Sequence, residues 1–388
     1  MFISNRIFDL QPEIAEWRRD FHQHPEICYE EVRTSKRVKE LLESFGVDKI
    51  ETGMGKTGVV AVIEGKENTS GRMIGLRADM DALPISEINE FEHKSTIDNR
   101  MHACGHDGHT SMLLGAAKYL VETRNFNGTA ILIFQPAEEG GAGAKKMMED
   151  GLFEKYNVDE VYGMHNMPGI PVGQFAMRVG GIMAAADFFD IEIEGLGGHA
   201  AMPHNTKDPI MVGSQIFNAI QTIISRQVDP IESGVISVTQ FHAGDAYNVI
   251  PQTAKLCGTM RSLDEGVREL MAKRMDEVTE NVGKAFDCKA KFIYRPNYPV
   301  TVNHKDQVDF AAKVAAEISG ADKVDVDTAP LMGAEDFSFM LQKKPGAYIF
   351  VGNGDSAGLH HPAYDFNDEA IPVGVSYWAK LIEMAMPA

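Results

Sequence analysis

The side chains best suited to chemistry gather in residues 101–109, where nine residues include one thiol, three imidazoles and one carboxylate. Cys104 stands where a loop is expected to enter a helix. The helix dipole there favours a thiolate, which is a better metal ligand or nucleophile than a thiol. Cys104 and His106 could therefore point at one metal ion. A buried structural thiol beside a helix-capping Asp107 is the alternative interpretation.

A cysteine nucleophile is a third interpretation of this cluster. It is disfavoured because a base two residues away in the same loop is poorly placed to activate the thiol while a third group orients it. His102 and His109 are expected to be structural or to support the ligands from behind.

Glu138 and Glu139 form a second candidate group. They follow Pro136 at the end of an expected strand and precede the glycine-rich residues 140–143. Pairs of glutamates are commonly solvated surface residues, which is the alternative here. Glycines, however, let backbone approach closely, and adjacent carboxylates can divide the work, one binding a metal while the other takes a proton from water.

Further polar residues follow other expected strands. Asp79 and Asp81 either cap a loop or orient a ligand imidazole. His165 could be a ligand or a core histidine, and His360 has the competing His361 beside it. Five side chains could serve as ligands: Cys104, His106, Glu139, His165 and His360. A catalytic site for one metal, with one coordination position left open for substrate or water, needs fewer than five protein ligands. Five ligands suit two metals that share a bridging ligand.

The elements that would position these residues alternate between strands and helices. Apolar runs at residues 58–63, 73–76, 129–134 and 161–164 are expected strands, and residues 107–121 an expected helix. A helix carrying Leu10, Ile14, Trp17 and Phe21, with Pro12 near its start, opens the chain. This alternation predicts an α/β layer architecture, in which ligands bind outside the carboxyl ends of the strands.

A second pattern begins near residue 185. Strand, helix, two strands, helix and strand follow in that order, which predicts an α+β ferredoxin-like domain over residues 185–295. Residues 1–184 and 296–388 would then form one discontinuous α/β domain around this insertion. Its glycine-rich residues 195–204 contain His199, which is either incidental to a flexible loop or a donor that a mobile domain delivers to an active site.

Composition and net charge limit the classes of partner that this protein is expected to bind. The chain has 388 residues, a formal net charge of −19 and a pI near 5.1. This charge argues against nucleic acid or anionic membrane as a partner. The four cysteines lack paired-motif spacing, and no signal-peptide or membrane-spanning run is evident, so a cytoplasmic protein is expected.

Seven stretches of the sequence, taken in order, resemble the bacterial amidohydrolase family of hippurate hydrolases and N-acyl-amino-acid amidohydrolases. They are residues 76–84, 101–110, 134–140, 163–166, 197–204, 332–337 and 358–362. Plant auxin-conjugate hydrolases share this family. Aminoacylase and glutamate-carboxypeptidase dinuclear metallopeptidases are more distant relatives. The resemblance implies a mixed-sheet, exopeptidase-like catalytic domain with an inserted lid and dimerisation domain.

The same resemblance implies a role for each site residue. Cys104 would bridge two divalent ions, with His106 and His165 on one and Glu139 and His360 on the other. Glu138 would be the general base, and Asp81 a supporting carboxylate. The lid histidine would be His199, which in a dimer can reach the opposite subunit. Asn248 and Arg261 would recognise the substrate carboxylate. The ligand types favour zinc or manganese and also admit cobalt or nickel.

The expected activity is hydrolysis of the amide bond of an N-acyl amino acid, either hippurate or an N-acetyl amino acid, by a homodimer or tetramer. A dipeptidase or carboxypeptidase acting through the same site is one alternative. A catalytically silent metal-binding or assembly protein is another. A thiol-nucleophile hydrolase differs from all of these in being inactivated by alkylation but not by chelators.

Overall fold

The computed structural model describes residues 3–388 and divides into two compact units. The second unit comprises Gly181–Thr301 and Pro330–Glu335, and the rest of the chain forms the first. These bounds are wider than the expected 185–295. Residues 330–335 join the second unit because Ala184 N–H donates to the carbonyls of Leu331, at 3.0 Å, and Gly333, at 2.8 Å.

The first unit is built on a mixed eight-stranded sheet of order β1-β2-β4-β3-β5-β16-β6-β15. The pairs β4–β3, β3–β5 and β5–β16 are parallel, whereas the pairs β1–β2 and β2–β4 are antiparallel. The strands are β1 Lys49–Met54, β2 Gly58–Glu64, β3 Met73–Asp79, β4 Thr129–Gln135, β5 Glu160–Pro168, β6 Phe175–Ala176, β15 Val324–Asp325 and β16 Gly346–Gly354. Every residue of β4 is buried, which is typical of a strand covered on both faces.

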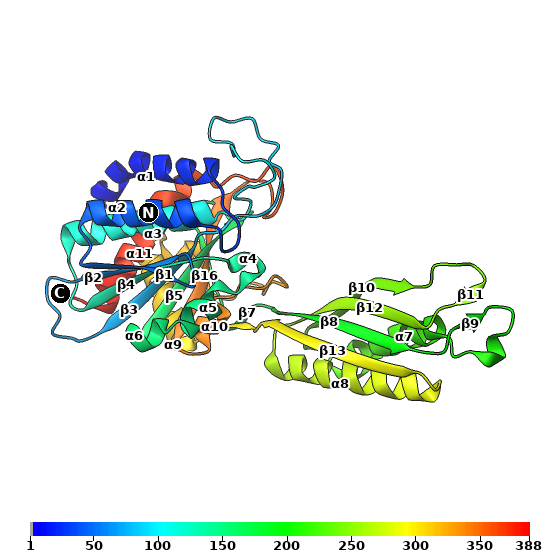
Figure 1. The fold of residues 1–388 in the computed structure, drawn as a ribbon. Coiled ribbons are helices and arrows are strands. Elements are labelled where there is room, and N and C mark those ends of the chain that lie inside the picture. Colours follow the sequence, from blue (N-terminus) through cyan, green and yellow to red (C-terminus); the bar gives the residue numbers. More distant parts are fainter. Residues whose placement is uncertain (1–2) are drawn as a thin grey trace. The chain divides into compact units, whose positions relative to one another are not determined.

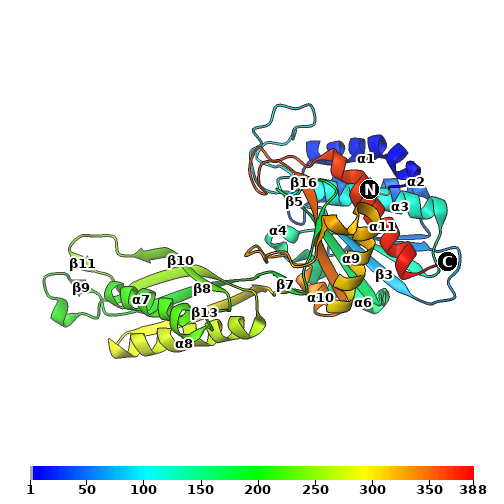
Figure 2. The ribbon, with the colours of Figure 1, turned by 180° about the vertical axis from the view of Figure 1, so that it is seen from behind.

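Five long helices pack with this sheet into one apolar cluster: α1 Asn5–Gln23, α2 Val32–Phe45, α3 His106–Thr123, α9 Lys305–Ser319 and α11 Ile371–Ala385. Shorter helices are α4 Glu138–Gly141, α5 Gly143–Glu149, α6 Leu152–Lys155, α10 Ser338–Leu341, η2 Ala321–Lys323 and η3 Asp368–Ala370. Helices α1 and α2 lie on the opposite face of the sheet from α5 and α6 (Figures 1 and 2). Ser4 caps α1, so Pro12 lies inside this helix and not near its start.

The second unit has the strand and helix order predicted for a ferredoxin-like domain. Its antiparallel sheet has the order β10-β12-β8-β13, and α7 and α8 pack with it around a separate apolar cluster. The elements are β8 Ala185–Glu194, α7 Pro209–Gln227, β10 Gly234–Ala243, β12 Thr253–Ser262, α8 Glu265–Ala285 and β13 Lys289–Tyr298. Short elements are β9 Gly198–His199, η1 Pro203–Asn205 and β11 Val249–Ile250, while β7 Gly180–Met183 and β14 Thr301–Asn303 lie where the chain passes between units.

The structure also shows the state of the cysteines and the character of the helices. All four cysteines are free thiols. Among residues 3–388, no helix combines the length and the apolar character needed to cross a membrane.

A buried ionic cluster joins α1 to the first turn of α3. Nδ1 of His22 lies 2.9 Å from Oδ2 of Asp107, and its Nε2 lies 3.2 Å from Oε1 of Glu87. The buried guanidinium of Arg18 bonds Asp365 and Asp368 at 3.0 and 2.8 Å. Burial alone would lower the pKa of His22, but Asp107 and Glu87 outweigh it and raise this pKa to about 9.

The ionic cluster predicts a pH dependence of stability. The folded pKa of His22 exceeds its ordinary value of 6.5, so its contribution is complete below that pH and is lost as pH rises toward about 9. The contribution of His22 to the free energy of unfolding of metal-free protein should therefore fall by about 3 kcal/mol across this window, as measured by urea denaturation. His22→Gln should reduce the slope of stability against pH by this amount, whereas His24→Gln, on the same helix end, should keep the wild-type slope. An unchanged slope in His22→Gln would contradict this assignment.

Candidate metal centre

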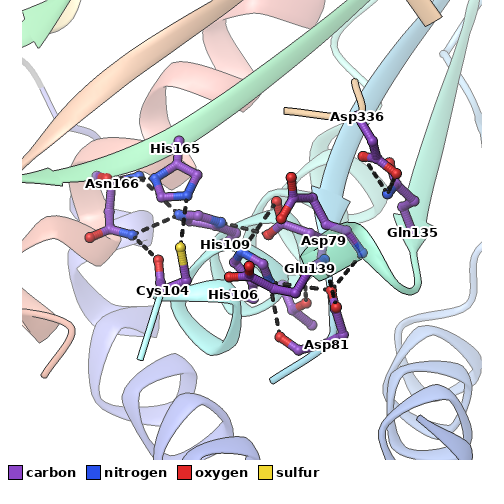
Figure 3. Close-up of polar contacts among 12 residues, drawn as sticks. Asp79, Asp81, Cys104, His106, His109, Gln135, Glu139, His165, Asn166 and Asp336 are labelled. Carbon is purple, nitrogen blue, oxygen red and sulfur yellow. Dashed lines mark hydrogen bonds and ion pairs between the residues drawn. The ribbon is translucent and has the colours of Figure 1, made fainter. Parts of the chain in front are cut away.

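The candidate site lies in the first unit, beside the first turn of α3 (Figure 3). The loop after β3 carries Asp81, and the loop after β4 leads into α4, which carries Glu138 and Glu139. His165 lies within β5 and His106 begins α3. The site thus forms at the carboxyl ends of neighbouring parallel strands, where α/β folds place their ligands.

The five predicted ligands come together in two overlapping groups. Ligand atoms of Cys104, His106 and His165 all lie within 4.8 Å of one another, and so do those of Cys104, Glu139 and His360. Sγ of Cys104 is 3.4 Å from Nε2 of His165, and Nε2 of His360 is 3.1 Å from Oε1 of Glu139. Cys104 is common to both groups, and Glu138 lies in a third group with His106 and Glu139.

The imidazoles present lone pairs to this centre. Nδ1 of His106 donates to the carbonyl of Asp81 at 2.9 Å, and Nδ1 of His165 donates to the carbonyl of Asn166 at 2.6 Å. These bonds fix the tautomers and leave each Nε2 facing the centre. Nε2 of His106 is buried and has no hydrogen-bond partner among residues 3–388. Because such orphaned atoms are rare in folded proteins, this one fits a bound cation.

The electrostatics of the centre also fit a cation. Burial, reinforced by Glu139 and Glu138, holds the pKa of the Cys104 thiol well above its ordinary range. Burial would lower the pKa of His106, but Asp79 and Asp81 outweigh it and raise this pKa to about 10. Carboxylates contribute to both shifts, so negative charge is concentrated around the centre. A soft thiolate, imidazoles and carboxylates together form a donor set suited to divalent transition metals.

Asp81 fixes the loop that carries the glutamates. Its carboxylate accepts the backbone N–H of Glu138 at 2.9 Å and that of Glu139 at 3.0 Å. The loop needs such support because Ala137 and Ala142 both have left-handed backbones, with φ of 54° and 53°. Each left-handed residue other than glycine costs roughly 1–2 kcal/mol.

A buried chain of hydrogen-bonded polar side chains holds the ligand residues in position. Oδ1 of Asp79 accepts from Nδ1 of His109 at 2.6 Å, and Nε2 of His109 accepts the backbone N–H of Asn166 at 2.9 Å. The Asn166 amide in turn donates to the Cys104 carbonyl at 2.7 Å. His109 thus occupies the supporting position expected of it. His102 is fully buried outside every candidate ligand group in the described chain.

Sequence reasoning missed several members of this support. Arg77 donates to Asp79 at 2.7 Å, to Gln135 at 2.8 Å and to Asp336 at 3.0 Å, all buried (Figure 3 shows Asp79, Gln135 and Asp336). The available signal was a polar residue inside or at the end of an otherwise apolar strand, as with Arg77 in β3 and Gln135 in β4. Asn166, next to His165, carried no separate signal.

The remaining predicted residues belong to the second unit. His199, in β9, pairs with Val249, and Ala200 N–H donates to the carbonyl of Asn248 at 3.0 Å, so His199 and Asn248 lie on adjacent exposed segments. Arg261 lies apart on β12, where it is partly buried and donates to the carbonyl of Met260 at 3.0 Å.

Comparison with known proteins identifies the family. The model for peptidase family M20/M25/M40 matches residues 75–384. A hippurate hydrolase from Campylobacter jejuni is 44% identical over 381 residues, which cover 98% of each chain. Thermostable carboxypeptidase 2 from Saccharolobus solfataricus is 44% identical, with 93% of this chain and 91% of that protein covered.

A solved structure gives the same result. The crystal structure of a dinuclear metal binding peptidase of the M20 family from Bacillus subtilis superposes with a TM-score of 0.86 and 34% identity, covering 98% of this chain and 99% of the other. The resemblance drawn from the seven sequence motifs is confirmed. The chain belongs to peptidase family M20/M25/M40.

Proposed function

We propose that this protein is a metal-dependent amidohydrolase that cleaves the amide bond of N-acyl amino acids, with N-benzoylglycine (hippurate) and N-acetyl amino acids as its first candidates. The observation that carries the proposal is that Cys104 is shared by two ligand groups, with Glu138 in the adjoining group. The 44% identity to a hippurate hydrolase across nearly the whole of both chains supports this choice of substrate.

Two divalent ions fit the donor set. Cys104 would bridge them, His106 and His165 would hold one, and Glu139 and His360 would hold the other. Zinc or manganese suits these ligands first, and cobalt and nickel are compatible. When bound, two such ions polarise a carbonyl group and lower the pKa of water.

Glu138 is the proposed general base. The residue is 7% exposed and its backbone is fixed by Asp81, and a carboxylate oxygen lies within 4.8 Å of ligand atoms of His106 and Glu139. It takes a proton from the attacking water and delivers it to the nitrogen of the leaving amine, as a general base that becomes a general acid.

The second unit is proposed to act as a lid and as the surface of dimerisation or tetramerisation. His199 would donate to the oxyanion that forms at the substrate carbonyl, in its own subunit or the opposite one. Arg261 would bind the free carboxylate of the substrate through its planar guanidinium, and Asn248 would donate to the same group.

Replacing the proposed base should abolish turnover without releasing metal. Glu138→Gln preserves the size of the side chain but cannot take a proton, so kcat should fall roughly 10²–10⁴-fold with metal content unchanged. Elemental analysis and hippurate hydrolysis measure the two quantities. Glu154→Gln, which changes an exposed glutamate on α6, is the matched control and should retain full activity. Full activity in Glu138→Gln would refute the assigned base.

Metal removal distinguishes this mechanism from a thiol-nucleophile hydrolase and from a silent metal-binding protein. Chelation should abolish amide hydrolysis, and added zinc or manganese should restore it, because water and not Cys104 is the proposed nucleophile. Activity that survives chelation but is lost on alkylation would favour the thiol mechanism. Tight metal binding without turnover on any acyl amino acid would favour the silent protein.

A carboxypeptidase or dipeptidase is the second candidate, because a carboxypeptidase is as similar in sequence as the hippurate hydrolase. Under identical metal loading, kcat/KM should be higher for hippurate and N-acetyl amino acids than for dipeptides with a free amino group. The reverse order would favour the peptidase. Release of the free amino acid measures both reactions.

A further inference from the structure

The loop of residues 136–144 carries Glu138 and Glu139 in a backbone that does not form by local preference alone. Its left-handed residues Ala137 and Ala142 flank the two glutamates. Three successive N–H groups, from Ala137 to Glu139, donate to buried carboxylates. Asp81 accepts two of these bonds, and Glu31 accepts the first, from Ala137 to its Oε1 at 2.9 Å.

Glu31 is placed for this contact and not for capping its own helix. It is the N-cap residue of α2, yet its side chain makes no capping bond there. Two N–H groups in the first turn of α2, those of Arg33 and Thr34, instead donate to Glu26 at 3.0 and 2.8 Å. The Glu31 carboxylate, which is fully buried, is therefore available to the loop.

The Glu31 carboxylate also accepts two hydrogen bonds from outside the loop. Oε1 accepts the backbone N–H of Tyr29 at 3.0 Å, and Oε2 accepts the hydroxyl of Thr57 at 2.6 Å. A buried carboxylate is costly unless hydrogen-bonded, so these bonds lock Glu31 in one orientation. Of its partners, Ala137 alone belongs to the loop.

Neighbours of Glu31 contact the far end of the same loop. The Tyr29 hydroxyl donates to the carbonyl of Gly141 at 2.7 Å. Cys28 packs so closely on Gly141 that a Cβ there would lie 2.3 Å from its Sγ. Residues 28–31 thus contact the loop on both sides of Glu138 and Glu139.

We propose that Glu31 is a positioning residue, whose hydrogen bond to Ala137 holds loop 136–144 in the conformation that places Glu138 and Glu139 at the candidate metal centre. The inference rests on the proposed function for what the two glutamates do, but not for how their loop is held. Glu31 lies more than a hundred residues before Ala137, at a separation of 106.

Four variants separate positioning from general stability. Glu31→Ala removes all three hydrogen bonds, and Glu31→Asp keeps the charge but retracts it from the loop. Glu31→Gln can keep every bond, because its oxygen accepts both N–H groups and its amide donates to the Thr57 hydroxyl. Thr57→Val removes one bond to Glu31 without touching the loop and is the matched control.

The first readout is hydrogen–deuterium exchange of metal-free protein, followed in peptides that contain residues 136–144. Loss of a buried hydrogen bond should speed exchange in this loop about tenfold in Glu31→Ala and Glu31→Asp. Glu31→Gln and Thr57→Val should exchange within about twofold of wild type, although Thr57→Val is also destabilised to urea.

The second readout is titration of the metal-free protein with Co²⁺, followed by visible absorption. Glu31→Ala and Glu31→Asp should bind Co²⁺ about tenfold more weakly, and on hippurate kcat should fall with little change in KM. Glu31→Gln should restore both quantities.

Unchanged loop exchange in Glu31→Asp would overturn the proposal, even if Glu31→Ala failed to fold. So would equal losses of loop protection and Co²⁺ affinity in Thr57→Val, because Glu31 would then act only through stability. If wild type failed to hydrolyse any acyl amino acid, the proposed function would fall, while exchange and Co²⁺ binding would still decide the role of Glu31.

Discussion

The site depends on one buried carboxylate, that of Asp81. Its two oxygens accept the N–H groups of Glu138 and Glu139, and its backbone carbonyl accepts Nδ1 of His106. One residue therefore fixes the candidate base and two candidate ligands that come from different parts of the chain. In a buried environment such charge-assisted bonds are strong when satisfied and costly when broken, so the arrangement has little freedom to drift.

Several buried carboxylates near Asp81 are paired with cationic or hydrogen-bonding side chains. Asp79 is held by Arg77 and His109, and Asp107 is held by His22. Cys104 lies among carboxylates, and its pKa is raised by burial and by the neighbouring glutamates. The supporting carboxylates are thus satisfied by the protein, while the centre keeps a surplus of negative charge for metal ions. Support of this kind, built on β3, β4 and α3, holds ligands more accurately than loops alone.

Local sequence pattern predicted the parts of this molecule that are local. Cys104 and His106 are two residues apart at the start of α3, and Glu138 and Glu139 closely follow a buried strand, so type and spacing identified them as candidates. The ferredoxin-like order of the second unit followed from alternating apolar runs. By contrast, Arg77 and Asp336 are 259 residues apart, and no local pattern specifies that they meet. The roles of Glu31 and Asn166 were hidden for the same reason.

Backbone conformation distinguishes His360 from His361 as the candidate ligand. His360 has a left-handed φ of 63° and lies beside Glu139, whereas Nδ1 of His361 accepts the N–H of Ala363. Sequence spacing alone hardly separates these neighbours. Likewise, the domain boundary predicted from the strand pattern missed residues 330–335, which join the second unit through backbone bonds to residues 182–184 that no local pattern specifies.

In the proposed metal centre, five side chains hold two divalent ions through a shared thiolate. Anomalous diffraction from crystals loaded with zinc, measured on both sides of the zinc edge, locates bound zinc ions. This arrangement predicts two peaks in each subunit, with Cys104 touching both, His106 and His165 on one, and Glu139 and His360 on the other. A single peak, or a metal held by Asp79, His106 and His109, which also form a candidate group, would contradict it.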